Sequence, residues 1–202
     1  MKLYYSPGAC SLAPHIILEE TKQNAALVRV DTKTHKTQDG ADYYAINPKG
    51  SVPLLELDGG ERLTEGPIIV QYLSEKARRE DLIPAAGTLA RYRVLEWQNY
   101  ITSELHKSFS PLFNPAFDAA AKSLFLAALH KKFSWVQQQI GSKEYLTGST
   151  FTGADAYLFT VARWSGAVKL DLSDLGGFQQ YLERVAARPA VRAAMKAEGL
   201  IQ

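Results

Sequence analysis

The only cysteine of the chain, Cys10, lies in the segment YYSPGACSLAPHIILEE (4–20), where a predicted strand gives way to a predicted helix. Pro14 fits a helix only in its first turn, so this helix must begin near Cys10 or Ser11. The unpaired N–H groups of a helix start favour a thiolate and lower the pKa of a thiol. The position therefore indicates a reactive thiol, while a small buried apolar residue is the alternative role. Without a second cysteine, any redox role must use an external thiol.

A proline at the entrance to a predicted strand is the second feature that bears on chemistry. In NPKGSVPLLEL (47–57), Pro53 with a trans peptide bond would simply begin the strand. With a cis bond it would turn the Val52 backbone sideways, so that an N–H and a C=O could pair with an extended, peptide-like ligand. The residues alone leave both forms open.

A second predicted helix start, in LTEGP (63–67), places Glu65 beside unpaired backbone N–H groups. Such a site suits a ligand with both a carboxylate and an amine, because the N–H groups take the former and Glu65 the latter. The alternative is that Glu65 only complements the helix dipole.

A polar stripe follows one face of the predicted helix TLARYRVLEWQNYITSELHKSF. At 100° per residue, four polar side chains fall on this face, opposite an apolar one: Asn99, Ser103, His106 and Ser110. Either the face is solvated and His106 is a surface histidine, or the face closes over the first half of the chain.

The segment STFTGADAYLF (149–159) predicts a helix start that serves stability. Thr152 precedes Asp155 by three residues, a spacing close to that of a capping box. We therefore assign this motif to folding and not to chemistry.

The elements that position these residues divide the chain in two. Residues 2–6, 10–21 and 25–31 read as strand, helix and strand, and 52–65 read as a hairpin that turns at Asp58, Gly59 and Gly60, followed by a helix. From about residue 88 every periodic segment is helical. The sequence thus predicts an α/β domain over 1–77, a polar linker over 78–87 and an all-α domain over 88–202.

The composition of the chain argues against nucleic-acid binding, membrane association and a Cys/His metal site. The 202 residues are 46% hydrophobic and 22% charged, and 23 basic against 21 acidic residues give a net charge of +2. No surplus of positive charge is left for nucleic acid. No apolar run reaches the length of a membrane span, about 18 residues, so we expect no membrane association and a cytoplasmic location. A single cysteine forms no internal disulfide, and no Cys/His spacing predicts a metal site.

Five motifs together resemble the bacterial beta-class glutathione S-transferases, in order and over nearly the whole chain: YYSPGACSL, NPKGSVPLLEL, LTEGPIIVQYL, SELHKSFSPLF and FTGADAYLF. The resemblance implies a thioredoxin-like N-terminal domain with a cis Pro53, a helical second domain and a homodimer. It also implies that glutathione is a substrate and that no cofactor is bound permanently.

The same resemblance implies which residues bind glutathione: Cys10, Ser11, Val52, Pro53, Glu65, Gly66, Asn99, Ser103, Glu104, Leu105 and His106. Cys10 would face the glutathione sulfur and act with His106 in catalysis. Val52 would pair with the cysteinyl backbone, and Glu65 with Gly66 would hold the γ-glutamyl end. The family often has lysine at the position of His35, so either His35 or the neighbouring Lys36 would meet the glycine carboxylate.

For a small electrophilic second substrate, the resemblance implies a pocket formed by Lys107, Phe109, Phe113 and Trp164, although the three aromatic residues also suit the helical core. The implied reaction is attack of the glutathione thiolate on an electrophilic carbon, which forms a thioether. Thiol–disulfide exchange or dehalogenation through Cys10 is one alternative. A noncatalytic binding protein on the same fold is another.

Overall fold

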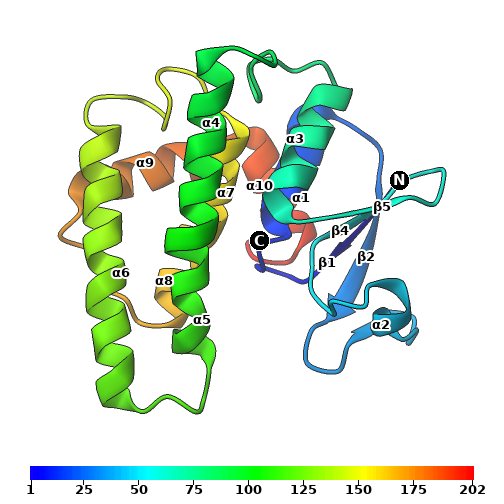
Figure 1. The fold of residues 1–202 in the computed structure, drawn as a ribbon, viewed down its shortest axis with the longest axis horizontal. Coiled ribbons are helices and arrows are strands. Elements are labelled where there is room, and N and C mark those ends of the chain that lie inside the picture. The colour runs from blue at the N-terminus through cyan, green and yellow to red at the C-terminus, as the bar shows by residue number, and fades with distance from the viewer.

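The computed structural model describes residues 1–202, and its first part is an α/β domain (Figure 1). Its elements are β1 (Lys2–Tyr5), α1 (Leu12–Thr21), β2 (Ala26–Asp31), β3 (Lys36–Thr37), α2 (Tyr43–Ile46), β4 (Leu54–Glu56), β5 (Arg62–Thr64) and α3 (Gly66–Lys76). The predicted strand–helix–strand unit, the hairpin and the following helix are confirmed. The short elements β3 and α2 were not predicted, because two and four residues are too few to show a period.

The five strands form one mixed sheet in the order β3-β2-β1-β4-β5. The central strand β1 runs parallel to β2 and antiparallel to β4, so that Leu3 lies between Leu27 and Leu55. A crossover helix is needed between the parallel strands β1 and β2, and α1 supplies it. This topology places the turn from β1 into α1, which carries Cys10, at one end of the sheet.

The second part is entirely helical, which confirms the predicted fold class. Its elements are α4 (Leu89–Tyr100), the π-helix η1 (Ile101–His106), α5 (Lys107–Phe113), α6 (Ala119–Ile140), α7 (Gly153–Ala162), α8 (Trp164–Ala167), α9 (Gly176–Ala186) and α10 (Pro189–Ala197). The helix predicted from residue 88 is thus interrupted by a π-helical turn. The domain limits at 77 and 88 remain a prediction, and the segment between α3 and α4 contains neither helix nor strand.

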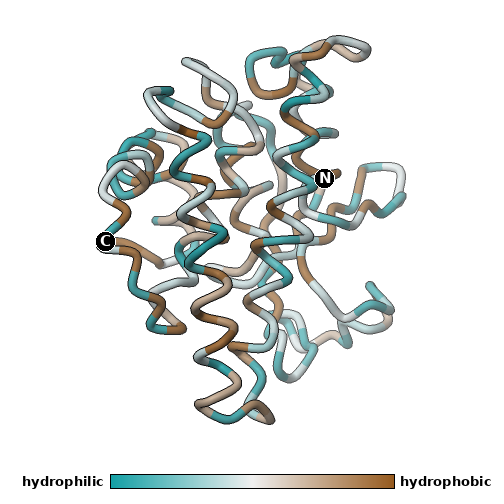
Figure 2. Tube along the Cα trace, turned by 60° about the vertical axis from the view of Figure 1, so that its left-hand side comes forward, coloured by the Kyte–Doolittle hydropathy of each residue, from teal (hydrophilic) through white to brown (hydrophobic).

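The two parts share one apolar core, which runs from the sheet through α1 and α3 into the helical bundle (Figures 1 and 2). Helix α1 is buried along most of its length and packs against α3, α7 and α10. At the contact of α3 with α7, a Cβ on Gly153 would lie 2.3 Å from Val70 Cγ1, so the close approach requires glycine. The walls of any cleft between the two parts are therefore fixed by shared packing.

A buried carboxylate organises the start of α7. Asp155 is fully buried and accepts hydrogen bonds from Thr152 N (2.8 Å), Thr152 Oγ1 (2.9 Å), Leu146 N (2.9 Å) and Tyr181 OH (2.8 Å). The predicted capping box at Thr152 is present. The motif also ties α7 to the preceding loop and to α9.

None of the helices is both long and apolar enough to cross a membrane.

Candidate functional site

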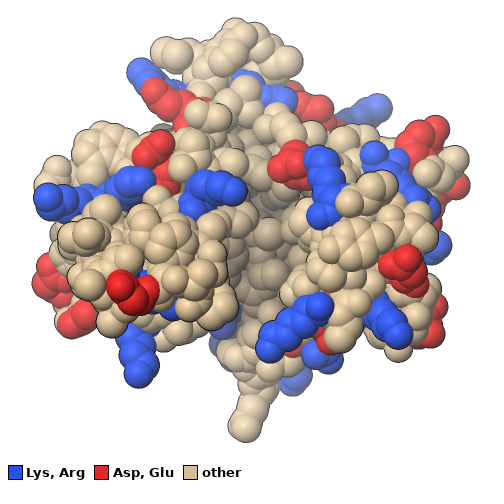
Figure 3. All heavy atoms as spheres, turned by 60° about the horizontal axis from the view of Figure 1, so that its bottom comes forward, with Lys and Arg blue, Asp and Glu red and all other residues tan.

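A cleft between the sheet domain and the helical domain collects most of the predicted site residues. It has two lobes of about 450 and 370 Å³, which share Cys10, Ser51, Val52, His106 and Ser110. We call the lobe that includes Phe109, Phe113 and Trp164 the aromatic lobe, and the one that includes Glu65 and Gly66 the Glu65 lobe. Figure 3 shows a deep hollow between the two halves of the molecule, with charged side chains along its rim.

Cys10 lies just before α1, where Ser11 is the N-cap, and its Sγ donates a hydrogen bond to Val52 O at 3.2 Å. Burial raises the pKa of the Cys10 thiol to about 12 and outweighs the opposite effect of the Cys10 and Ser11 N–H groups. The expected lowering of this pKa is therefore wrong, because desolvation destabilises the thiolate by more than the N–H groups of the helix start stabilise it. At neutral pH Cys10 is a hydrogen-bond donor.

The Ser11 side chain does not face the cleft. It is fully buried, and its hydroxyl accepts a hydrogen bond from Ser6 N (3.1 Å) and donates one to Ser6 O (3.2 Å). Ser11 therefore shapes the turn that carries Cys10 and reaches the sulfur only through its backbone N–H.

The loop before Cys10 is held from the far end of the chain. Gly8 N donates to Glu198 Oε2 at 2.8 Å, and Trp164 Nε1 donates to Gly8 O at 2.8 Å. Glu198 is itself fixed by the buried His15, whose Nδ1 lies 2.9 Å from Glu198 Oε1. Both the N–H and the C=O of Gly8 are thus hydrogen-bonded, and these two bonds position Cys10, which follows two residues later.

Val52 presents a backbone edge to the cleft whose N–H is free and whose C=O accepts only from Cys10 Sγ. The Val52–Pro53 bond is cis, as the resemblance implied. Tyr43 OH and Asn47 Nδ2 both donate to Ser51 O, at 2.9 and 2.7 Å, and hold the segment in place. Val52 N–H has no partner in the chain. An extended peptide-like ligand can therefore pair with this edge as an added strand would.

The Glu65 lobe combines a carboxylate with a helix start. Glu65 is the N-cap residue of α3, and the N–H of Gly66 has no acceptor in the chain. Glu65 Oε1 pairs with Lys49 Nζ at 2.8 Å, and both side chains are more than half exposed. A ligand amine can replace this ammonium at Glu65 and release Lys49 for a carboxylate. Lys49 was not predicted, although it stands next to Gly50 in the motif around Val52.

Of the two candidates for the glycine carboxylate, His35 lines the cleft and Lys36 does not. His35 Nδ1 lies 3.1 Å from Gly50 O, and its ring packs on Tyr44 with centroids 4.4 Å apart. Lys36 is exposed on the edge strand β3. Lys49 also lines the aromatic lobe, so a carboxylate near His35 has a cation within the same lobe.

His106 enters the cleft from η1 and is held by two neighbouring rings. Its Nδ1 lies 2.7 Å from Tyr157 OH, and Trp164 meets it edge-on with centroids 4.7 Å apart. Burial lowers the pKa of His106 to about 4, and the adjacent Lys107 acts in the same direction. The imidazole is therefore neutral at physiological pH and carries one N–H.

This low pKa predicts that His106 stays neutral between pH 8 and pH 5. The unfolded chain binds a proton at this histidine below about pH 6.5, whereas the folded chain does not until about pH 4. The free energy of unfolding therefore decreases as the pH is lowered from about 6.5 to about 4. NMR titration of the imidazole signals, assigned with His106→Ala, should show the His106 signals unshifted at pH 5. A His106 midpoint near 6.5 would contradict the buried, neutral state.

The polar stripe predicted on this helix does not form a single face. A π-helical turn spans residues 101–106, and its i→i+5 bonds take an additional residue into the turn, which rotates the following face. Thr102, His106 and Ser110 accordingly line the cleft, whereas Ser103 is exposed and donates to Asn99 O. Asn99 lies in an adjoining hollow together with Glu65.

Two more residues that the resemblance assigned to glutathione lie outside the cleft of this chain. Glu104 pairs with Lys132 of α6 (3.0 Å), and Leu105 is fully buried in the core. Helical periodicity had not placed either residue on the polar stripe, so their contact with glutathione stays a prediction of the resemblance. Thr102 lines the Glu65 lobe and was not predicted.

Three of the four predicted pocket residues line the aromatic lobe, and Lys107 lies in the Glu65 lobe instead. Trp164 meets Phe109 and Phe113 edge-on, with centroids 5.5 and 6.2 Å apart. Phe109 is 1% exposed and belongs to the core, whereas Phe113 is 52% exposed at the mouth. The lobe thus offers an apolar wall to a small second ligand.

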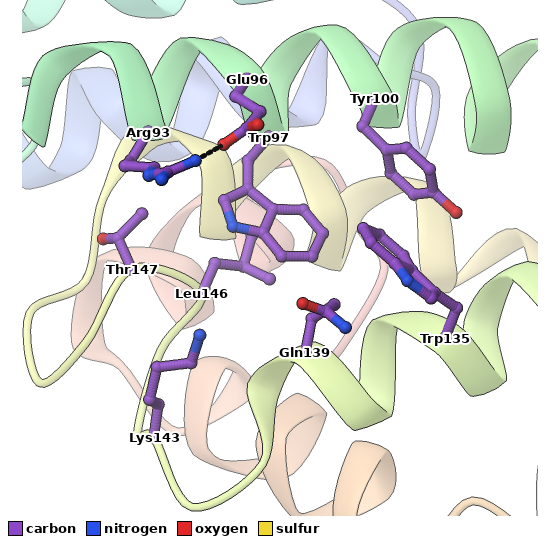
Figure 4. A pocket seen from close by; sticks show the side chains of 9 residues that line it. All are labelled: Arg93, Glu96, Trp97, Tyr100, Trp135, Gln139, Lys143, Leu146 and Thr147. Atoms are coloured by element: carbon purple, nitrogen blue, oxygen red, sulfur yellow. Dashed lines mark hydrogen bonds and ion pairs between the residues drawn. The ribbon is translucent and has the colours of Figure 1, made fainter. Parts of the chain in front are cut away.

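A further cavity of about 550 Å³, between α4 and α6, shares no residue with the cleft (Figure 4). Trp97, Tyr100 and Trp135 form one side of it, and Arg93 pairs with Glu96 along α4 at 2.7 Å. It contains neither a thiol nor a free strand edge. We therefore place the functional site in the cleft at Cys10.

The fold and cleft define a class of protein that combines a thioredoxin-like domain, which can bind a thiol peptide, with a helical domain that covers it. Comparison with known families agrees, since residues 1–75 match the N-terminal domain and 103–197 the C-terminal domain of glutathione S-transferase. The chain belongs to the glutathione S-transferase family.

Individual relatives cover its whole length. Glutathione S-transferase GstA of Escherichia coli O157:H7 is 46% identical over 200 residues, which are 99% of this chain and 100% of that protein. Two solved structures each cover 100% of both chains. A sphingomonad glutathione S-transferase complexed with glutathione is 41% identical with a TM-score of 0.94. The bacterial beta class glutathione S-transferase of Sphingomonas chungbukensis is 43% identical with a TM-score of 0.95.

Proposed function

We propose that this chain is a glutathione transferase that joins glutathione to small, mostly apolar electrophiles. The observation that carries the proposal is the meeting of Cys10, the free Val52 edge and His106 in one cleft, between a carboxylate at one end and an aromatic wall at the other. Glutathione fits as an extended ligand along Val52, with its γ-glutamyl end at Glu65 and Gly66 and its glycine end toward His35 and Lys49.

The chemistry follows from two neutral donors. A free thiol has a pKa of about 8.5, so glutathione is mostly protonated at neutral pH. When glutathione loses its thiol proton to water, the S–H of Cys10 turns from Val52 O to the ligand, and it stabilises the thiolate together with the N–H of His106, because both groups are uncharged donors at that pH. The thiolate attacks an electrophilic carbon, the new C–S bond forms, and a leaving group such as halide departs with the bonding electron pair.

The protonated state of Cys10 distinguishes this reaction from exchange. Thiol–disulfide exchange requires a thiolate as attacking group, and the raised pKa of Cys10 disfavours that form. We therefore rank exchange and dehalogenation through Cys10 second. No observation favours the noncatalytic alternative.

Two measurements test the proposal. Calorimetry should detect binding of reduced glutathione to the whole protein, and mixing with an aryl halide such as a chlorodinitrobenzene should give the thioether at a rate above that without enzyme. If glutathione binds but no aryl halide, alkyl halide or activated alkene is conjugated, the result would support the noncatalytic binding protein instead. Reduction of a mixed disulfide as the faster reaction would favour exchange.

Replacing Glu65 with glutamine should raise the KM for glutathione about tenfold, because the variant loses a charge-assisted bond to the ligand amine. Turnover should change little, since Glu65 and the aromatic wall lie in different lobes of the cleft. Glu61→Gln removes another exposed carboxylate of the same domain, outside the cleft, and serves as the control. Equal KM values for the two variants would refute the assignment of Glu65.

Three further properties are part of the proposal: membership of the beta class, a cytoplasmic location and a homodimer. The similarity to a beta class enzyme over both full chains supports the first, and the single cysteine suits a reducing compartment. Exposed apolar side chains on α3 and α4, Ile68 (46%) and Tyr92 (60%), support association. Light scattering after gel filtration measures the oligomeric state.

A further inference from the structure

Tyr157 of α7 is buried, and its hydroxyl takes no direct part in the proposed reaction. Its side chain is 2% exposed, and its Oη lies 2.7 Å from His106 Nδ1 and 3.5 Å from Thr102 Oγ1. A neutral imidazole carries its single proton on one nitrogen, and the bond made by one nitrogen decides which of the two it is. The direction of the Tyr157–His106 hydrogen bond therefore decides what His106 presents to the cleft.

The neighbouring bonds fix that direction. Thr102 donates its hydroxyl proton to Gln98 O at 2.8 Å, so toward Tyr157 it can only accept. If His106 Nδ1–H donated to Tyr157, the phenol proton would have, within the chain, only the 3.5 Å contact with Thr102, which is too long for a good bond. If Tyr157 donates to Nδ1, its proton has a partner at 2.7 Å, a distance typical of an O–H donor.

We propose that Tyr157 is a positioning residue that donates to His106 Nδ1 and thereby keeps the proton on Nε2, where it faces the cleft. Burial raises the pKa of the Tyr157 phenol, which remains a donor across the physiological range. Nε2 has no bonding partner within the chain, and His106 lines both lobes. Trp164 and Tyr157 both meet the imidazole edge-on, at 74° and 73°, and restrict its rotation.

The role of Tyr157 rests on the proposed reaction, because the position of the His106 proton decides how the imidazole meets the glutathione sulfur. With the proton on Nε2, His106 donates a hydrogen bond to the glutathione thiolate. With the proton on Nδ1, Nε2 would present a lone pair to a negative sulfur, which destabilises the thiolate. Tyr157, which also lines the Glu65 lobe, thus selects between a donor and an acceptor at Nε2 through its bond to Nδ1.

The wild-type protein gives the first test, which needs no activity. Labelling with ¹⁵N-histidine distinguishes the two neutral forms by the chemical shifts of the ring nitrogens and their couplings to the ring protons, with His106→Ala for assignment. We expect the Nε2–H form at pH 7. The Nδ1–H form would overturn the proposal, whether or not the protein conjugates glutathione.

Tyr157→Phe gives the second test. The variant should show a mixture of the two forms and a kcat lowered about tenfold, while the KM for glutathione stays within twofold. Tyr181→Phe removes another buried phenol donor of the helical domain, which bonds to Asp155, and should lower the melting temperature with kcat retained. An unchanged His106 spectrum or an unchanged kcat in Tyr157→Phe would overturn the proposal. If no variant conjugates glutathione, the proposed function fails, and the nitrogen spectrum still decides the role of Tyr157.

Discussion

Replacing His106 with alanine should lower kcat for glutathione conjugation about 100-fold, whereas Cys10→Ala should lower it by less than about tenfold. An imidazole N–H is a stronger hydrogen-bond donor than a thiol S–H, which explains the difference. Both residues line both lobes of the cleft, so we expect both to act on one sulfur. Groups that stabilise one charge are non-additive, and we expect the double variant to depart from the product of the single losses by about fivefold.

A second histidine provides the matched control for this cycle. His130 lies on α6, away from the cleft, and pairs with Asp174 at 2.9 Å. His130→Ala should leave kcat unchanged and combine additively with Cys10→Ala. Steady-state kinetics with glutathione and an aryl halide measure all the variants. Strictly additive losses for Cys10 and His106 would show that the two residues do not act on a common sulfur.

Asp155→Ala should destabilise the fold by about 3 to 5 kcal/mol, because it removes one acceptor from several buried donors at once. The N–H groups of Leu146 and Thr152 and the hydroxyl of Tyr181 would each lose a partner in the core. For a chain of this size, that loss lowers the melting temperature by roughly 10 °C. Calorimetry or circular dichroism during heating measures it.

Asp118→Ala is the control for Asp155, since Asp118 is also an aspartate at a helix start. Asp118 caps α6 and accepts from Ala121 N at 2.8 Å, but it is exposed. Its loss should cost about 1 kcal/mol, the usual value of an N-cap. Equal losses for the two variants would show that the additional partners of Asp155 contribute nothing to stability.

Local sequence patterns were sufficient for most of the secondary structure, although not for β3, α2 or the π-helical turn. Pro14 fixed the start of α1 to within two residues, and Asp58, Gly59 and Gly60 indicated the β4–β5 turn. These predictions succeeded because each depends on backbone constraints within a few residues. The cis bond before Pro53 required the resemblance, since an isolated X-Pro bond favours trans.

The pKa of Cys10 and the contacts of His106 depend on residues that are distant in the sequence, so local sequence patterns could not predict them. A helix start lowers a thiol pKa, but the burial that raises the pKa of Cys10 is provided by residues far along the chain. Periodicity assumes 3.6 residues per turn, so it placed Ser103 on the face of His106, whereas the helix with its π-helical turn presents Thr102 to the cleft. Tyr157 lies in a motif that correctly indicated a capping box, and nothing local indicated its bond to His106.

The two bonds that hold Gly8 tie the geometry of Cys10 to the order of protein synthesis. Gly8 and Cys10 leave the ribosome early, whereas their anchors, Trp164 and Glu198, are translated more than 150 residues later. The strands of the first domain can pair before then, but the loop before the cysteine lacks the Trp164 anchor until α8 has emerged and the Glu198 anchor until the residues beyond α10 have emerged. The thiol is therefore among the first groups synthesised and among the last to reach its working position, so a nascent chain does not acquire the glutathione site domain by domain.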